Sequence, residues 1–144
     1  MHANQGPTAG VCALFLLGLA GCSGPVAPAD PPGGGRAFRL DFARFETEVS
    51  PILTRHGCDA GGDCHGGGIR GTLALSPAGA KDPAFDFDQV SLQVNASDPA
   101  MSPILRKPLD EAAGGTPHGV TAFASPADTD YRTILAWIES GEFQ

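Results

Sequence analysis

The chain has 144 residues and a formal net charge of −7 at pH 7. Its nine Lys and Arg are scattered, so the sequence offers no basic patch for a nucleic acid. The acidic balance is instead compatible with a basic protein partner, which it would attract electrostatically.

Residues 1–21 predict an export signal. The apolar run over residues 11–20 is too short to span a bilayer as a mature helix. It ends in Leu19-Ala20-Gly21-Cys22, which resembles the lipobox of bacterial lipoproteins at all four positions, although residues 1–10 contain no Lys or Arg. We therefore expect Cys22 to be lipidated and to become the N-terminus. The alternative is ordinary signal cleavage that leaves Cys22 as a free thiol.

Lipidation at Cys22 predicts an exported protein that is anchored to a membrane of the cell envelope. Each buried methylene of an acyl chain contributes about 0.8 kcal/mol, so several chains anchor a protein durably. Ser23, in place of Asp, resembles the sorting signal for the outer membrane. Residues 22–37 are then the lipidated Cys and a Pro- and Gly-rich linker, and residues 38–144 are a single domain.

The first element of this domain is predicted to be a helix that follows Asp41, a suitable N-cap. Its apolar residues recur at helical spacing and are Phe42, Phe45, Val49 and Leu53. Pro51 should kink the helix, or end it at Ser50 and begin a second helix. Gly57 ends the element.

Shorter elements follow in the middle of the domain. Residues 72–75 should be extended. Residues 86–94 fit a helix, but part of the segment also alternates like a strand. The paired acids Asp86 and Asp88 are expected on a solvated face or turn. Ser102 and Pro103 suit the N-cap and first turn of a short helix that ends before Pro108.

The last part of the domain is predicted to be a long loop and one helix. Residues 109–127 are Gly-rich and loop-like. Asp128 should cap a helix that Gly141 stops, with Trp137 beside its apolar face. That face consists of Tyr131, Ile134, Leu135 and Ile138.

The chemistry-bearing stretch runs from Cys58 to Cys64 and His65, with three glycines after it. Covalent haem attachment uses this order: two cysteines bind the porphyrin, and the adjoining His binds the iron. The usual gap between the cysteines is two residues, whereas here it is five. The surplus can loop outward, because Gly61 and Gly62 accept backbone conformations that other residues disfavour.

Two other interpretations remain open from spacing alone. Exported cysteines meet an oxidising compartment, where Cys58 and Cys64 can form a disulfide. A metal site is the third possibility, with the ligands His56, Cys58, Cys64 and His65.

The order and spacing of several motifs over residues 40–141 resemble the planctomycete-type cytochrome c domains. The matching pieces are Val49-Ser-Pro-Ile-Leu53, Cys58 to Gly66, Leu73-Ala-Leu75, Asp98-Pro99 with Ser102, Leu105 and Lys107-Pro108, His118-Gly119, and Asp130-Tyr131 with Leu135, Trp137-Ile138 and Gly141. One departure is Val120, which stands where the family has a second Gly after its histidine.

The resemblance implies a mainly α fold: a small cytochrome c-like helical domain with long Gly-rich loops, whose first and last helices cross. It implies one haem c, bound covalently to Cys58 and Cys64, with His65 as the proximal iron ligand. His118 is the favoured distal ligand and Met101 the alternative. Thioether ligation would raise the reduction potential relative to imidazole.

The expected function is electron transfer by a membrane-anchored haem protein, with an unidentified redox partner protein. Enzymatic activity is not expected, because no Ser/His/Asp arrangement or phosphate-binding loop is present. An iron without a distal ligand would, however, permit peroxidase-like chemistry. The alternative is a haem-free lipoprotein domain that a Cys58–Cys64 disulfide ties together, serving as a binding or structural module of the envelope.

Overall fold

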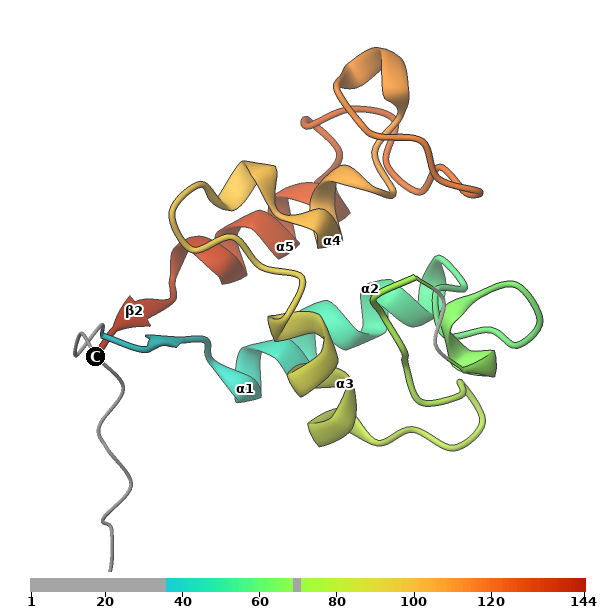
Figure 1. Cartoon of the computed structure of the whole chain (residues 1–144), viewed down its shortest axis with the longest axis horizontal. Helices are drawn as coiled ribbons and strands as arrows, with labels where there is room; N and C mark the ends of the chain where they lie inside the picture. The colour runs from blue at the N-terminus through green and yellow to red at the C-terminus, as the bar shows by residue number, and fades with distance from the viewer. Residues whose placement is uncertain (1–35, 69–70) are drawn as a thin grey trace, which may run out of the picture. The chain divides into compact units, whose positions relative to one another are not determined.

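Helical segments from opposite ends of the domain pack against each other and build its core (Figure 1). The structure is a computed structural model that describes residues 36–68 and 71–144. The predicted signal, Cys22 and nearly all of the linker lie outside the described residues. The described part is rich in helix, as predicted, and its only sheet has two short strands.

The first helical segment covers residues 42–55 and is interrupted once. It consists of α1 (Phe42–Arg44), the π-helical turn η1 (Phe45–Val49) and α2 (Ser50–Arg55). Asp41 Oδ1 accepts a hydrogen bond from Arg44 N at 3.0 Å, so the predicted N-cap is confirmed. A π turn precedes Pro51, which has no N–H for a regular helical bond, and α2 begins beside it.

The last helix, α5 (Thr129–Glu139), begins at the predicted cap Asp128, whose Oδ1 accepts from Asp130 N at 2.8 Å. Its fully buried side chains include Trp137, which the sequence placed beside the apolar face. The Trp137 ring lies 5.6 Å from that of Phe45, and its Nε1 donates to Asp41 O at 2.9 Å. Trp137 thus joins α5 to the start of the first segment.

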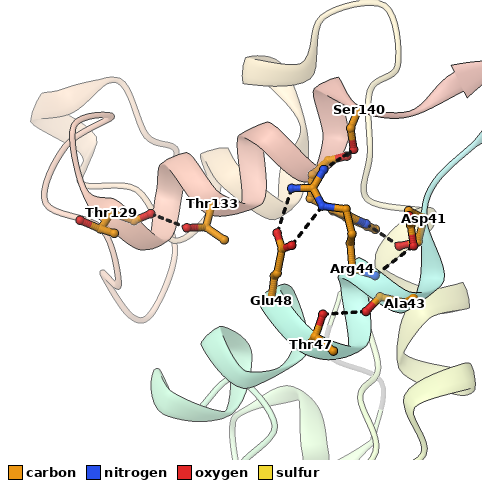
Figure 2. Close-up of polar contacts among 9 residues, drawn as sticks. Asp41, Ala43, Arg44, Thr47, Glu48, Thr129, Thr133 and Ser140 are labelled. Carbon is orange, nitrogen blue, oxygen red and sulfur yellow. Dashed lines mark hydrogen bonds and ion pairs between the residues drawn. The ribbon is translucent and has the colours of Figure 1, made fainter.

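A polar cluster ties the same two segments together at the surface (Figure 2). The Arg44 guanidinium donates two hydrogen bonds to the Glu48 carboxylate, at 3.1 and 2.8 Å, and a third to Ser140 Oγ at 2.6 Å. Because Ser140 follows α5 directly, this fork fixes the C-terminal end of α5 on α1.

The two ends of the domain meet in an antiparallel pair of β1 (Phe38–Arg39) and β2 (Glu142–Phe143). Helix α5 ends before Gly141, as predicted, but Gly141 has no left-handed backbone. A Cβ at Gly141 would lie 2.3 Å from Cζ of Phe38. A larger residue would therefore have to displace the Phe38 ring, which packs against the backbone of Gly141.

Shorter elements connect the two segments. The predicted middle helix is confirmed as α3 (Pro83–Ser91), which begins earlier than expected because Asp82 caps it. The predicted short helix is α4 (Pro103–Arg106). Residues 73–76 are buried and lie outside the helices and strands. The remaining turns are the 3-10 helices η2 (His65–Gly67), η3 (Pro99–Met101) and η4 (Glu111–Ala113).

Within the described ranges, no helix is both long and apolar enough to cross a membrane.

Candidate functional site

A cavity of about 320 Å³ lies between the end of α2, the cysteine loop and the loop that contains His118. These two loops extend to the same side of the domain in Figure 1. Most of the lining is apolar and includes Ile52, Leu53, Leu73, Ile104, Ala122 and Phe123. Cys58, Cys64, His65 and His118 also line the cavity. Its volume lies within the range of small-molecule sites, which is about 300–1,000 Å³.

Cys58 lies at this cavity because it follows the end of α2 closely. Gly57 follows the helix with φ +70°, a left-handed conformation that suits glycine. Gly57 N donates to Thr54 O at 2.9 Å, and Cys58 N donates to Leu53 O at 2.9 Å. This pair of bonds is a Schellman cap. The predicted stop at Gly57 is therefore confirmed, and the cap fixes where the cysteine loop begins.

Four of the five residues between the cysteines lie at the surface. Residues 60–63 are exposed, whereas Asp59 is buried. His65 N donates to Cys58 O at 2.9 Å and closes the loop at its base. A Cβ at Gly66 would lie 1.8 Å from Asp59 O, so only glycine fits there. The loop thus bulges outward, as expected, while both cysteines stay at the cavity.

Two of the three histidines that line the cavity, His65 and His118, are oriented in the same way. His65 Nδ1 lies 3.1 Å from Leu73 O, and His118 Nδ1 lies 3.0 Å from Val120 O. A carbonyl oxygen only accepts, so each Nδ1 must carry the proton and donate it. In a neutral imidazole, Nε2 then holds the free lone pair. A backbone carbonyl that orients a ring through its other nitrogen is typical of metal-binding histidines.

His65 and His118 face each other as a pair. Their ring centroids are 6.1 Å apart, and the ring planes differ by only 8°. The structure therefore brings together four of the predicted site residues, namely Cys58, Cys64, His65 and His118. This set of two thiols and two imidazoles around an apolar cavity could hold a flat metal cofactor.

Met101, the alternative distal ligand, does not line this cavity. It is 49 % exposed, and its Sδ accepts a hydrogen bond from Arg106 Nη1 at 2.8 Å. The structure thus brings His118, and not Met101, to His65.

The Cys58 thiol is strongly biased toward its protonated form. Burial, together with the nearby Asp59 carboxylate and Cys64, raises the pKa of Cys58 to about 11. A thiolate metal ligand would require the opposite shift. The two cysteines are not joined to each other. Across residues 36–68 and 71–144, no group of three or more His, Cys, Asp or Glu side chains is arranged to hold a metal ion.

His56, a ligand in the four-residue metal interpretation, is bonded elsewhere. Its Nε2 lies 2.8 Å from Asp130 Oδ2, and Arg55 Nη2 lies 2.6 Å from Asp130 Oδ1. The hydrogen bond from Arg55 is the main reason that the pKa of Asp130 is lowered, with a further contribution from His56. These contacts brace the end of α2 against the start of α5 at the edge of the cavity.

Sequence reasoning missed the charged residues beside the cysteine loop. Lys81 pairs with both Asp59 and Asp86, and both carboxylate residues are buried. The expectation that Asp86 lies on a solvated face is therefore wrong. Asp86 precedes the buried Val90 by four residues, so helical spacing already placed it on the inner face of α3.

Comparison of the chain with protein-family models, with curated proteins and with solved structures finds no match.

Proposed function

We propose that the chain is an exported, lipid-anchored c-type haem protein that transfers single electrons. Cys58 and Cys64 would hold one haem c through thioether bonds, with His65 as the proximal iron ligand and His118 as the distal one. The observation that carries the proposal is the pairing of His65 with His118 at a cavity that both cysteines line.

The separation of the histidines fits two ligands of one metal ion. Metal–imidazole bonds are about 2.0–2.1 Å long, so imidazoles on opposite sides of an ion have ring centres roughly 6 Å apart. The observed separation of 6.1 Å agrees with that value. The hydrogen bonds of both Nδ1 atoms to backbone carbonyls leave both Nε2 atoms available as ligands.

The surroundings of the donor atoms also fit a porphyrin. The lining is mostly apolar, which favours burial of a flat hydrophobic ring and excludes water from it. When bound, haem supplies an iron that gains and loses one electron, and the protein positions and tunes it. His65 and His118 would both be ligands of that iron and would leave it no site for a substrate, which favours electron transfer over peroxidase-like chemistry.

We also propose that the fold is cytochrome c-like, which the arrangement of the domain supports. The first helical segment and α5 share one core, and the cysteine loop follows the first segment directly. Val120 lines the cavity and is 51 % exposed, so the cavity reaches the surface there. An edge of the haem near Val120 would be accessible to a redox partner protein, which the acidic chain would attract if that partner is basic.

The test is covalent haem content. The full chain is expressed in a bacterial host that has haem-attachment machinery and an envelope, and the purified protein is assayed by the pyridine haemochrome spectrum and by intact mass. We expect one haem per chain that survives denaturation. The Cys58→Ala/Cys64→Ala variant, made in the same host, is the control and should lose the covalent haem. A colourless wild-type protein with a Cys58–Cys64 disulfide would overturn the proposal and favour the haem-free envelope module.

A further inference from the structure

A buried charge cluster adjoins the cysteine loop. Lys81 Nζ lies 3.2 Å from Asp59 Oδ2 and 2.5 Å from Asp86 Oδ2. Both carboxylate side chains are 1 % exposed, and the Lys81 side chain is 24 % exposed. One cation is thus paired with two carboxylates, which gives the cluster a net charge of −1 when both carboxylates are ionised.

Neutral donors hold both carboxylates in place. Thr54 Oγ1 donates to Asp59 Oδ2 at 2.5 Å. Ser76 donates to Asp86 twice, from its backbone N at 2.6 Å and from its Oγ at 2.9 Å. These bonds reach Asp59 Oδ2 and both carboxylate oxygens of Asp86, and they add no charge to the cluster.

Lys81 keeps its charge in this environment. Burial alone would lower the pKa of Lys81, but hydrogen bonds and charge attraction from Asp86 and Asp59 outweigh it, so the pKa is raised. The cation therefore compensates one carboxylate, and its removal would leave two anions in a poorly screened interior.

Asp59 places the cluster next to the proposed haem site. It follows Cys58 directly in the chain, and its carbonyl oxygen abuts Gly66, the neighbour of His65. Charges in a protein interior act more strongly than in water, because the surrounding dielectric constant is lower. A fixed negative charge here therefore acts on whatever metal centre Cys58 and His65 hold.

Resting on the proposed function, we propose that the cluster of Lys81, Asp59 and Asp86 lowers the reduction potential of the bound haem. Oxidised iron carries one more positive charge than reduced iron. A net negative charge beside the site stabilises the oxidised form more than the reduced form. The cluster would thus make the protein a stronger electron donor than the same ligands would without it.

The experiment measures the midpoint potential of the haem-loaded full chain by redox titration. Asp59→Asn removes a negative charge and should raise the midpoint potential. Lys81→Met removes the positive charge and should lower it, and Lys81→Arg should restore the wild-type value. Asp88→Asn makes the same charge change as Asp59→Asn on the exposed side of α3 and should shift the potential less.

Opposite shifts separate a charge effect from a purely structural one. A cluster that only held the loop would give shifts of the same sign, or loss of haem, in both variants, and either result would overturn the inference. Should Asp59→Asn fail to load haem, the comparison of Lys81→Met with Lys81→Arg decides the matter, because Lys81 is partly exposed. Wild-type protein without haem overturns both proposals, whereas haem with unchanged potentials overturns only this one.

Discussion

The imidazole rings of His65 and His118 lie 8° from parallel, with their centroids 6.1 Å apart. The residues are 53 positions apart in the chain, and each ring is oriented by a different backbone carbonyl, Leu73 O or Val120 O. Aromatic rings that pack against each other have centroids about 4.5–7 Å apart, so the separation is also that of a stacked pair. The proposed shared ion would bind both Nε2 atoms, which the hydrogen bonds of the two Nδ1 atoms leave available.

Replacement of His118 tests this relationship. In the haem-loaded protein, His118→Ala should convert the low-spin absorption spectrum to a high-spin one, because the iron loses an axial imidazole. Added imidazole should restore the low-spin spectrum. Met101→Leu is the matched control and should leave the spectrum unchanged, since Met101 does not line the cavity. A low-spin spectrum that persists in His118→Ala and disappears in Met101→Leu would assign the ligand to Met101.

Gly66 provides a test of how the cysteine loop closes. A Cβ at this position would lie 1.8 Å from Asp59 O and 2.9 Å from Ala60 O. Both are backbone atoms, so the loop itself must shift to relieve the clash. We expect Gly66→Ala to lower the free energy of unfolding by about 2 kcal/mol or more.

Gly61→Ala is the control for this change, because no atom lies within 4 Å of a Cβ at Gly61. It should alter the free energy of unfolding by less than about 0.5 kcal/mol. Denaturant unfolding followed by circular dichroism compares the two variants. Equal stabilities would show that the close approach of Gly66 to Asp59 is not needed for the fold.

The helices could be predicted because each has local signals. Asp41 and Asp128 act as caps in the structure, and Gly57 ends the first segment. Trp137 lay beside the predicted apolar face, yet it is fully buried. Its position depends on the Phe45 ring and on the Asp41 carbonyl, which come from the other end of the domain. Such a contact across 96 residues leaves no local pattern.

The site shows the same division between local and distant information. Cys58, Cys64 and His65 stand in one loop, so their motif predicted that they would act together. The approach of His118 to this loop required the resemblance to a known family. The partners of Asp59 and Asp86 were missed because Lys81 joins them from outside the motif. A lone lysine in a loop carries no periodic signal.

Ionisation of Cys58 should make the haem-free chain less stable at alkaline pH. Burial and the Asp59 carboxylate raise the pKa of this thiol from 9.0 to about 11. The unfolded chain therefore loses this proton at a lower pH than the folded chain. The resulting contribution is fully present below about pH 9 and is lost as the pH rises to about 11. It amounts to about 3 kcal/mol for a shift of this size.

Unfolding free energies of the reduced, haem-free protein between pH 8 and pH 11 check this expectation. Cys58→Ser should flatten the decline relative to the wild type. Lys81 and Tyr131 also have raised pKa values and contribute with the same sign, so the difference between the two proteins is the informative quantity. A parallel decline in both would exclude Cys58 as its source.

Protonation of Asp130 should make the chain less stable at acid pH. The hydrogen bond from Arg55 lowers the pKa of Asp130, burial opposes that effect, and a bond from His56 adds to it. Its contribution is therefore present above the unfolded pKa of about 4 and is lost as the pH falls through the lower folded value. Asp130→Asn should make the protein less stable at pH 7 and its acid unfolding less steep.

Asp88→Asn is the control for Asp130→Asn, because Asp88 is an exposed aspartate on a different helix. It should keep the acid profile of the wild type. Thermal unfolding between pH 2 and pH 7 measures both variants. Identical profiles for the two would mean that the brace between α2 and α5 contributes nothing to stability.

Gly141 and Phe38 form the last testable contact, where the two ends of the domain meet. A Cβ at Gly141 would lie 2.3 Å from Cζ of Phe38, the far end of a side chain that can move. Gly141→Ala should therefore cost about 1–2 kcal/mol, less than Gly66→Ala, because the ring can rotate away from Phe143. In the Phe38→Ala background the obstacle is absent, and Gly141→Ala should be close to neutral. A double-mutant cycle of unfolding free energies measures the coupling. Additive effects would show that the Phe38 ring does not impose glycine at this position.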